Sequence, residues 1–293
     1  GTLNLPNNHP AAIAAQVAMI DHLLEGRFIL GISPGGLRSD AEIFENLDKD
    51  RKAMIRESIN QILKIWSGKA PYQIEGKFWN ISTATTINKE TGQGIIIGPY
   101  QQPHPEICVT AMSPSSESVS EAASNGWSVI SANFLQPVGV ASHWPKLQEG
   151  WARANLPNSP ESWRVAKSIF VAEDEKTAVR YAKDISGAYG HYYRSIMKKI
   201  IDNGRPDLFK LNNEMTDNEI TIELLLDTLV FAGTPVQIAE KILRFRDIVG
   251  PFGTLIYAGH DWVDSGLARQ SMELMAAEVM PLVNNEISMI DHI

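Results

Sequence analysis

The chain has 293 residues, of which 44% are hydrophobic and 20% charged, and this composition is ordinary for a globular protein with a large core. Its net charge of -8 argues against nucleic-acid binding, which needs clustered Lys and Arg, and no apolar run approaches the ~20 residues of a membrane span. Cys108 is the only cysteine, which excludes an intrachain disulfide and a cysteine metal cluster, so we expect a cytoplasmic protein of enzyme size.

Strand-like and helix-like segments alternate from the start of the chain. A predicted strand at Thr2–Leu5 precedes a helix over Ala11–Glu25, which Pro10 opens because the first helical turn does not need its N–H. A second helix, Arg51–Trp66, leads into an irregular stretch over about 67–105 that is rich in Gly, Pro, Thr and Asn. This stretch is longer than an ordinary connection, so we expect an excursion or a lid.

The second half of the chain continues the alternation. The segment "GTPVQIAEKI" predicts a helix with a capping box, in which Thr234 caps, Pro235 opens the helix and Gln237 completes the box. Further helices are predicted at about 140–156, at about 174–203, at Thr221–Phe231 and at Leu267–Leu282.

Such an alternation indicates parallel strands joined by helical crossovers, in an open doubly wound sheet or in a (β/α)₈ TIM barrel. No G-x-G-x-x-G follows a strand, so nothing supports the dinucleotide fold. The predicted strands are Thr2–Leu5, Arg27–Ile32, Glu106–Met112, Trp127–Ala132, Trp163–Val171 and Gly253–Ala258. A barrel needs two more, or about 60 residues at ~30 per βα unit, and we expect them before Gly1.

In either fold, ligands bind at the C-terminal ends of the strands. The segment "SPSSES" at one such end predicts a helix start, with Ser113 as the N-cap and with Ser115, Ser116 and Ser118 in the first turn. A helix N-terminus offers free N–H groups and a partial positive charge, and hydroxyls add donors. The segment therefore fits a phosphate site, although simple capping by Ser113 explains it too.

Two histidines and one serine lie at other strand ends. His260 and Asp261 could transfer protons, but neighbours on a strand point to opposite sides, and a packed His beside a capping Asp is an equal alternative. His9 is either a ligand-facing group or an ordinary residue before a helix. Ser33 opens "SPGG", which either lets the backbone approach a flat ligand or forms a flexible turn. No metal-binding pattern such as H-E-x-x-H is present.

Four segments occur in a characteristic order, "HPAAIAAQVAMIDHLLEGRFILGISPGG", "MIRESINQILKIWSGKAPYQIEGKFWNI", "GTPVQIAEKI" and "FGTLIYAGHDWVD". Together they resemble the bacterial-luciferase-like flavin-dependent monooxygenases, over nearly the whole chain. Within that family, "YGHYYRSIMKKI" and "HPEICVTAMSPSSES" are most similar to the diketocamphane monooxygenases, whereas "GPYQQPHPEI" and "AGHDW" resemble limonene monooxygenase-type members.

The resemblance implies one luciferase-like TIM barrel over residues 1–293, here with strands 3 to 8 and without the first two βα units, and usually a homodimer. It also implies a two-component enzyme, in which a separate flavin reductase supplies reduced FMN. Reduced FMN reacts with O₂ to a C4a-peroxyflavin, which oxygenates a small apolar ketone or terpenoid by Baeyer–Villiger reaction or epoxidation. A peroxyflavin survives only where water is excluded, and the stretch over 67–105, with Phe78, Trp79 and Tyr100, would supply a lid.

The resemblance also assigns site residues. His9 lines the flavin ring with Asn8 nearby, and Ser33 lies beside the reactive flavin edge, so that His9, Ser33 and His260 are the catalytic candidates. Where luciferases proper have a Cys–Arg pair, this chain has Ser33-Pro34, so light emission with a long-chain aldehyde is not implied. The implied FMN-binding residues are Asn8, His9, Ser33, Ser113, Ser115, Ser116 and Ser118.

Two alternatives stay open at this point. One is an FMN- or deazaflavin-dependent dehydrogenase on the same barrel, which would oxidise or reduce its substrate without inserting oxygen. The other is a non-catalytic, flavin-binding or dimerising relative that has lost part of its barrel.

Overall fold

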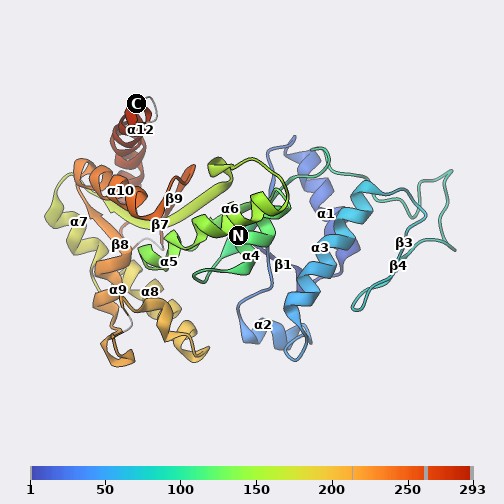
Figure 1. Ribbon diagram of the computed structural model, residues 1–293, viewed down its shortest axis with the longest axis horizontal. Coiled ribbons are helices and arrows are strands. Elements are labelled where there is room, and N and C mark those ends of the chain that lie inside the picture. Colours follow the sequence, from blue (N-terminus) through green and yellow to red (C-terminus); the bar gives the residue numbers. More distant parts are fainter. Residues whose placement is uncertain (1, 213, 261–262, 291–293) are drawn as a thin grey trace. The chain divides into compact units, whose positions relative to one another are not determined.

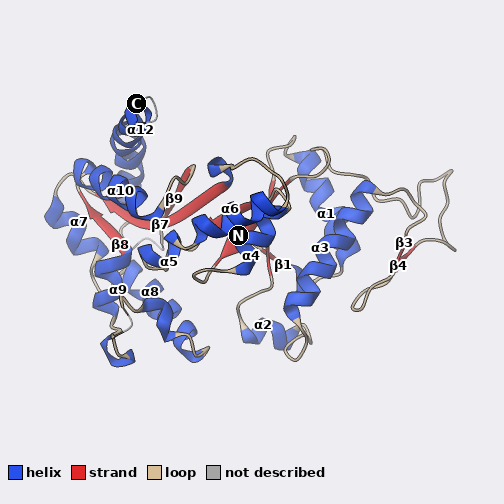
Figure 2. Cartoon of the chain, in the orientation of Figure 1, coloured by secondary structure: helices blue, strands red, loops and turns tan. Residues whose placement is uncertain are grey.

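The computed structural model describes residues 2–212, 214–260 and 263–290, and the chain divides into two compact units, Gly1–Thr110 and Ala111–Ile293. Both units are built from parallel strands alternating with helices (Figures 1 and 2). The α/β class is therefore as predicted. A single barrel domain over 1–293 stays a prediction.

The first unit holds three parallel strands in the order β1–β2–β5. β1 (Leu3–Asn4) pairs with β2 (Ile29–Ser33), and β2 pairs with β5 (Glu106–Ala111). In the first pair Asn4 lies opposite Ser33, which places two polar side chains at the same end of the strands. The helical elements of this unit are η1 (Leu5–Asn7), α1 (Pro10–Leu23), α2 (Arg38–Ile43) and α3 (Arg51–Ser67), and α1 and α3 lie side by side (Figure 1).

The stretch over 67–105 contains a short antiparallel hairpin of β3 (Gln73–Ile74) and β4 (Ile81–Ser82). The Glu57 carboxylate on α3 holds the turn between these strands. It accepts hydrogen bonds from three successive backbone N–H groups, at 2.8, 2.8 and 2.9 Å, in residues 77–79. The turn is therefore fastened to the helix by one side chain.

The far end of the same stretch is fastened to α1. The buried Asp21 carboxylate accepts the backbone N–H of Gln101 at 2.8 Å and its side-chain amide at 2.7 Å. That amide also donates to the carbonyl of Phe28 at 2.8 Å. Because an unpaired buried carboxylate is costly, Asp21 fixes where the excursion rejoins the strands. The expected role of this stretch as a lid stays a prediction.

The second unit is organised around the long strand β7 (Trp163–Val171), which is conspicuous in Figure 2. β7 pairs in parallel with β6 (Ser128–Ser131) at its start, with β9 (Thr254–Ala258) along its middle and with β8 (Val230–Gly233) at its end. The strand β8 lies within and beyond the predicted helix Thr221–Phe231, so the count of six strands is wrong. Seven parallel strands are present in the described part of the chain.

The missed strand has a physical reason. The helix α9 (Ile222–Leu229) passes directly into β8, because Val230 adopts an extended conformation and its neighbours pair with β7. No Gly or Pro separates the helix from the strand, and apolar periodicity alone does not distinguish a short buried strand from the end of a helix.

Two predicted helices are each divided in the structure. The stretch 140–156 contains the end of α5 (Pro137–Ala141) and α6 (His143–Arg153), and the stretch 174–203 contains α7 (Glu175–Ala182) and α8 (Ala188–Asp202). Asp184 causes the second break, because its side chain accepts the N–H of Ser186 at 2.8 Å and thus competes with the helix. The capping box at the start of α10 (Pro235–Val249) is confirmed. The remaining elements are α4 (Glu117–Ser124), η2 (Pro160–Ser162), η3 (Pro206–Phe209), η4 (Asp217–Glu219), α11 (Ser265–Leu274), the π-helical turn η5 (Met275–Val279) and α12 (Met280–Ile290).

The core of the second unit contains one buried lysine. Lys167 on β7 is 1% exposed, and its Nζ lies 4.5 Å from the centre of the Phe231 ring and 5.2 Å from that of Phe245. Among the described residues its ammonium group has no hydrogen-bond partner. Burial lowers the pKa of Lys167 to about 7, and the charge of Lys183 acts in the same direction.

Two general observations bear on function. None of the helices in the described part is long and apolar enough to cross a bilayer. Within the same residues, no three His, Cys, Asp or Glu side chains gather where they could hold a metal ion.

Candidate functional site

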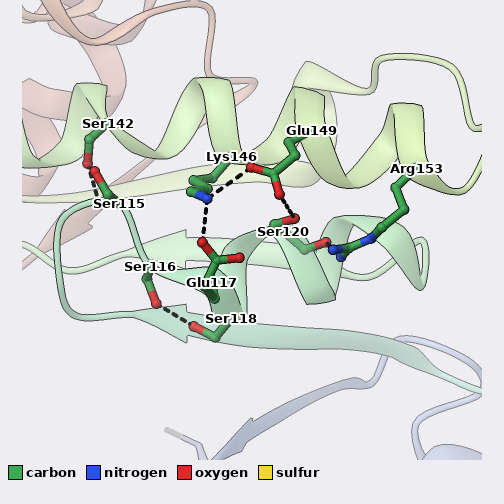
Figure 3. Close-up of polar contacts among 9 residues, drawn as sticks. All are labelled: Ser115, Ser116, Glu117, Ser118, Ser120, Ser142, Lys146, Glu149 and Arg153. Carbon is green, nitrogen blue, oxygen red and sulfur yellow. Dashed lines mark hydrogen bonds and ion pairs between the residues drawn. The ribbon is translucent and has the colours of Figure 1, made fainter.

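The serine-rich loop after β5 is shaped by one left-handed residue. Ser115 has a φ of 49°, and its N–H donates to the Ser142 hydroxyl at 2.7 Å (Figure 3). Because the chain turns at Ser115, the helix cannot start before it, and α4 begins at Glu117 with Ser116 as its N-cap. The prediction that Ser113 caps this helix is therefore wrong.

The N-terminus of α4 leaves its hydroxyl groups unused for capping. The Ser116 side chain makes no capping bond and instead lies 2.8 Å from the Ser118 hydroxyl, as Figure 3 shows. The first N–H groups of a helix have no partner within it. Two paired hydroxyls and these N–H groups form a set of donors that fits a phosphate group.

Charged side chains flank this loop. Lys146 pairs with both Glu117 and Glu149, so the negative charge of Glu117 beside the helix start is balanced (Figure 3). On another side, the guanidinium of Arg205 lies 3.4 Å from the Ser113 hydroxyl. Arg205 precedes η3, far along the chain, and the sequence analysis missed it.

The buried His143 supports the serine loop through a hydrogen bond to its backbone. His143 Nε2 lies 2.8 Å from the carbonyl oxygen of Ser113, which can only accept, so Nε2 carries the proton. Nδ1 then accepts from the Ser131 hydroxyl at 2.8 Å, while Ser131 accepts from the Trp163 indole at 2.9 Å. Burial lowers the pKa of His143, which fits this neutral ring.

A cavity of about 800 Å³ lies between α8 and the end of β9 in the same unit. Most of its walls are apolar or aromatic, with Ala188, Tyr192, Tyr257 and Met272 among the residues that line it. The predicted site residue His260 is one of its polar groups. A cavity of this size and lining suits a small, largely apolar organic molecule.

His260 is held by a ring stack and by a polar network. The ring of Tyr192 stacks on it, with centroids 3.9 Å apart, and His260 Nε2 lies 2.9 Å from the Ser168 hydroxyl on β7. Tyr192 donates to the Asn133 side chain at 2.8 Å, and Asn133 donates to Ser168 at 2.9 Å. The alternative partner Asp261 lies outside the described residues, so a His260–Asp261 pair is untested.

In the first unit, two polar side chains lie together at the ends of β1 and β2, those of Asn4 and of the predicted site residue Ser33. Ser33 donates to the Asn4 side chain at 2.6 Å, and the N–H of Gly35 donates back to Ser33 at 3.3 Å. Gly35 has a φ of 81°, and a Cβ there would lie 3.3 Å from the Asn4 side chain. The glycine of "SPGG" is thus required by a close approach, not only by a turn.

The other two predicted residues of this unit lie at the start of α1. His9 is exposed and is the N-cap of α1, where its Nδ1 accepts the N–H of Ala11 at 3.2 Å. The Asn8 side chain donates to the carbonyl of Asn4 at 3.3 Å. Capping by His9 leaves Nε2 as the ring nitrogen that carries the proton in the neutral form. A shared site of these residues with the serine loop stays a prediction.

Comparison with known proteins decides the family. A model of the luciferase-like monooxygenase family matches residues 1–250 of this chain. The chain belongs to this family.

This luciferase-like monooxygenase is similar to two curated enzymes and one solved structure. It is 27% identical to the 3,6-diketocamphane 1,6-monooxygenase of Pseudomonas putida, over 95% of the chain and 78% of that enzyme. It is 25% identical to the limonene 1,2-monooxygenase of Rhodococcus erythropolis, over 98% of the chain and 69% of that enzyme. The solved structure is the oxygenating constituent of 3,6-diketocamphane monooxygenase from Pseudomonas putida in complex with FMN, a type II Baeyer–Villiger monooxygenase. It has a TM-score of 0.82 at 26% identity, over 96% of this chain and 78% of that one. The predicted family is confirmed.

Several residues around the sites of this luciferase-like monooxygenase were not found from its sequence. Asn4, Asn133 and Ser168 are ordinary strand or strand-end residues in the pattern, and their contacts depend on strands far apart in the chain. His143 is marked by no motif in the sequence, yet it supports the serine loop through the carbonyl of Ser113. The segment "YGHYYRS" offered a signal, because a cluster of aromatic rings on one helix is typical of a face that packs against a neighbouring element.

Proposed function

We propose that the protein is an FMN-dependent monooxygenase that uses reduced FMN and O₂ to oxygenate a small apolar ketone or terpenoid. The observation that carries this proposal is the uncapped serine loop at the N-terminus of α4, in a chain similar to an FMN-bound oxygenating enzyme. The reaction is a Baeyer–Villiger insertion of oxygen beside a carbonyl or the epoxidation of an alkene.

The loop residues Ser113, Ser115, Ser116 and Ser118 would hold the FMN phosphate, and Arg205 supplies a positive charge at the loop. In the first unit, Asn8, His9 and Ser33 would face the flavin ring. When bound, reduced FMN activates O₂ and supplies the electrons for the incorporation of one oxygen atom. The chain contributes hydrogen-bond donors, orientation and the exclusion of water.

The substrate would occupy the cavity at His260. Its aromatic and aliphatic walls favour a compact apolar molecule, and the imidazole of His260 offers one polar contact for a carbonyl oxygen. The stretch over 67–105 is proposed as the lid of this enzyme, with Glu57 and Asp21 at its base.

The remaining proposals concern partners. A separate flavin reductase would supply reduced FMN, as the resemblance to two-component oxygenases implies. We also propose a homodimer in the cytoplasm, which sedimentation velocity and fractionation of cells would test.

Binding of FMN tests the phosphate site. The double variant Ser116→Ala/Ser118→Ala should bind reduced FMN about a hundredfold more weakly, since two lost hydrogen bonds to a charged group cost about 1.5 kcal/mol each. Ser124→Ala is the matched control, because Ser124 lies at the other end of α4, and its affinity should change less than twofold. If the double variant and the control bind FMN with equal affinity, Ser116 and Ser118 are not part of the FMN site.

Turnover tests the reaction. With chemically reduced FMN and a cyclic ketone, the protein should consume O₂ without NADH and yield a lactone. Turnover with a reduced deazaflavin and no oxygen insertion would favour the dehydrogenase. Flavin binding without any turnover would favour the non-catalytic relative.

A further inference from the structure

The Ser168 hydroxyl lies at the junction of three hydrogen bonds behind the cavity. It lies 2.9 Å from Asn133 Nδ2, 3.0 Å from the Tyr193 hydroxyl and 2.9 Å from His260 Nε2. Both Ser168 and Tyr193 are fully buried, so each polar hydrogen needs an acceptor. A hydroxyl has one hydrogen to donate and two lone pairs, and this fixes which patterns are possible.

One pattern suits a neutral His260. Asn133 and Tyr193 donate to Ser168, which fills both lone pairs, and Ser168 then donates its only hydrogen to His260 Nε2. The ring must carry its proton on Nδ1 in this pattern. The Ser168 and Tyr193 hydroxyls are then both paired.

A second pattern suits a protonated His260. Nε2–H donates to Ser168, Ser168 donates to the Tyr193 oxygen, and Tyr193 donates to the backbone carbonyl of Asn133, which lies 3.3 Å away. Asn133 Nδ2 still donates to Ser168. The protonated ring carries one proton more and both hydroxyls keep theirs, so the Ser168 and Tyr193 hydroxyls are again both paired.

We propose that Ser168 and Tyr193 are positioning residues whose hydroxyl chain reverses direction, so that His260 can hold or release a proton beside the cavity at no hydrogen-bonding cost. The proposal rests on the proposed function, because it gives the polar group of the substrate cavity the role of an acid–base residue toward a carbonyl compound. If His260 only packed against the tyrosines, the Ser168 and Tyr193 hydroxyls would need to be paired for only one protonation state of its ring.

Several titratable side chains among the described residues face His260 or line its cavity. From α8, Tyr192 stacks on the ring, whereas Tyr189 and Tyr193 contact it edge-on. Burial raises the pKa of all three phenols, so they are uncharged at neutral pH. Tyr257 from β9 and His191 from α8 line the same cavity, and burial raises the pKa of Tyr257 as well. His191 is the group that must be titrated separately.

The test is a histidine titration by NMR on the full chain without flavin or substrate. In Tyr193→Phe the Ser168 hydroxyl loses its acceptor whenever His260 is protonated, whereas the neutral pattern survives, so the pKa of His260 should fall by about one unit. Tyr189→Phe is the matched control. It removes a hydroxyl that donates to the Ile169 carbonyl and keeps a ring against His260, without touching Ser168. In the control the pKa of His260 should stay within 0.3 units or so of the unmodified protein.

Equal shifts in the two variants would overturn the proposal. The unmodified protein gives a second measurement that does not depend on a variant that folds. Its nitrogen chemical shifts should place the proton of neutral His260 on Nδ1, and a neutral ring protonated on Nε2 would contradict the first pattern. Because neither readout involves oxygenation, a failed oxygenase assay with the expected titration would reject the proposed function alone.

Discussion

Replacement of the buried lysine is the most direct test of the physical account of the second unit. Lys167→Met keeps the length of the side chain and its packing against Phe231 and Phe245, and it removes the ammonium group. A charged ammonium group loses its hydration when it is buried, and without a hydrogen-bond partner no equivalent interaction replaces it. Such groups are therefore rare in protein cores. We expect the substitution to stabilise the protein.

The magnitude follows from the pKa. Burial takes the pKa of Lys167 from 10.5 to about 7. At about 1.4 kcal/mol per unit, this shift destabilises the folded state by about 5 kcal/mol at low pH, and by about 4 kcal/mol at pH 7, where half of the folded molecules have already lost the Lys167 proton. The attraction of the cation to the Phe231 ring returns about 1 kcal/mol. Lys167→Met should therefore raise the free energy of unfolding by about 3 kcal/mol at pH 7.

The pH dependence has a definite sign. Between pH 7 and 10.5 the unfolded chain holds the Lys167 proton and the folded chain does not, so the stability of the unmodified protein rises with pH across this window. The variant lacks this contribution, and the two curves should converge toward high pH. Urea unfolding at several pH values measures both, with the exposed Lys176→Met on α7 as the control. If the variant is less stable than the unmodified protein at pH 7, or if its stability follows a parallel curve with pH, the Lys167 charge does not destabilise the folded state.

Three further predictions concern single side chains. Glu57→Ala should destabilise the first unit by about 2–3 kcal/mol and speed amide exchange at residues 77–79, whereas alanine at the exposed Glu75 should do neither. Gly35→Ala should cost about 1 kcal/mol or more in urea unfolding, because φ is 81° and the new Cβ approaches a neighbouring side chain, and a neutral result would contradict the close approach. Burial lowers the pKa of His143, so stability should fall as the pH drops below 6.5. His143→Gln should lose that acid sensitivity, as unfolding at pH 5 and pH 7 would show.

Local signals in the sequence predicted much of the fold. The capping box of α10 and the limits of α3 follow from side chains within one helical turn, and the structure has them where the pattern places them. The strand β8 was missed because its pairing with β7, not its own composition, decides its conformation. The break at Asp184 was missed for a related reason, since a single side chain competes there with an otherwise continuous helical pattern.

The sites were predictable to a lesser degree. The family resemblance identified the serine loop, yet Ser113 is not the cap, because the left-handed Ser115 moves the helix start by three residues. Contacts such as that of Ser168 with His260 join residues 92 positions apart, and no spacing rule relates them. Sequence reasoning therefore found residues that carry chemistry and missed those that orient them.

The two fastenings of the stretch over 67–105 have a consequence for protein engineering. Glu57 holds residues 77–79 and Asp21 holds Gln101, while the tip between these two points is closed by a bridge between Asn88 and Gln93 and is exposed from residue 88 to 95. Gly92 at this tip has open space around it. Because the chain is held on both sides of this tip, an insertion there should disturb the helices little. An epitope or a small fluorescent domain inserted beside Gly92 would be exposed to solvent and held at a defined position.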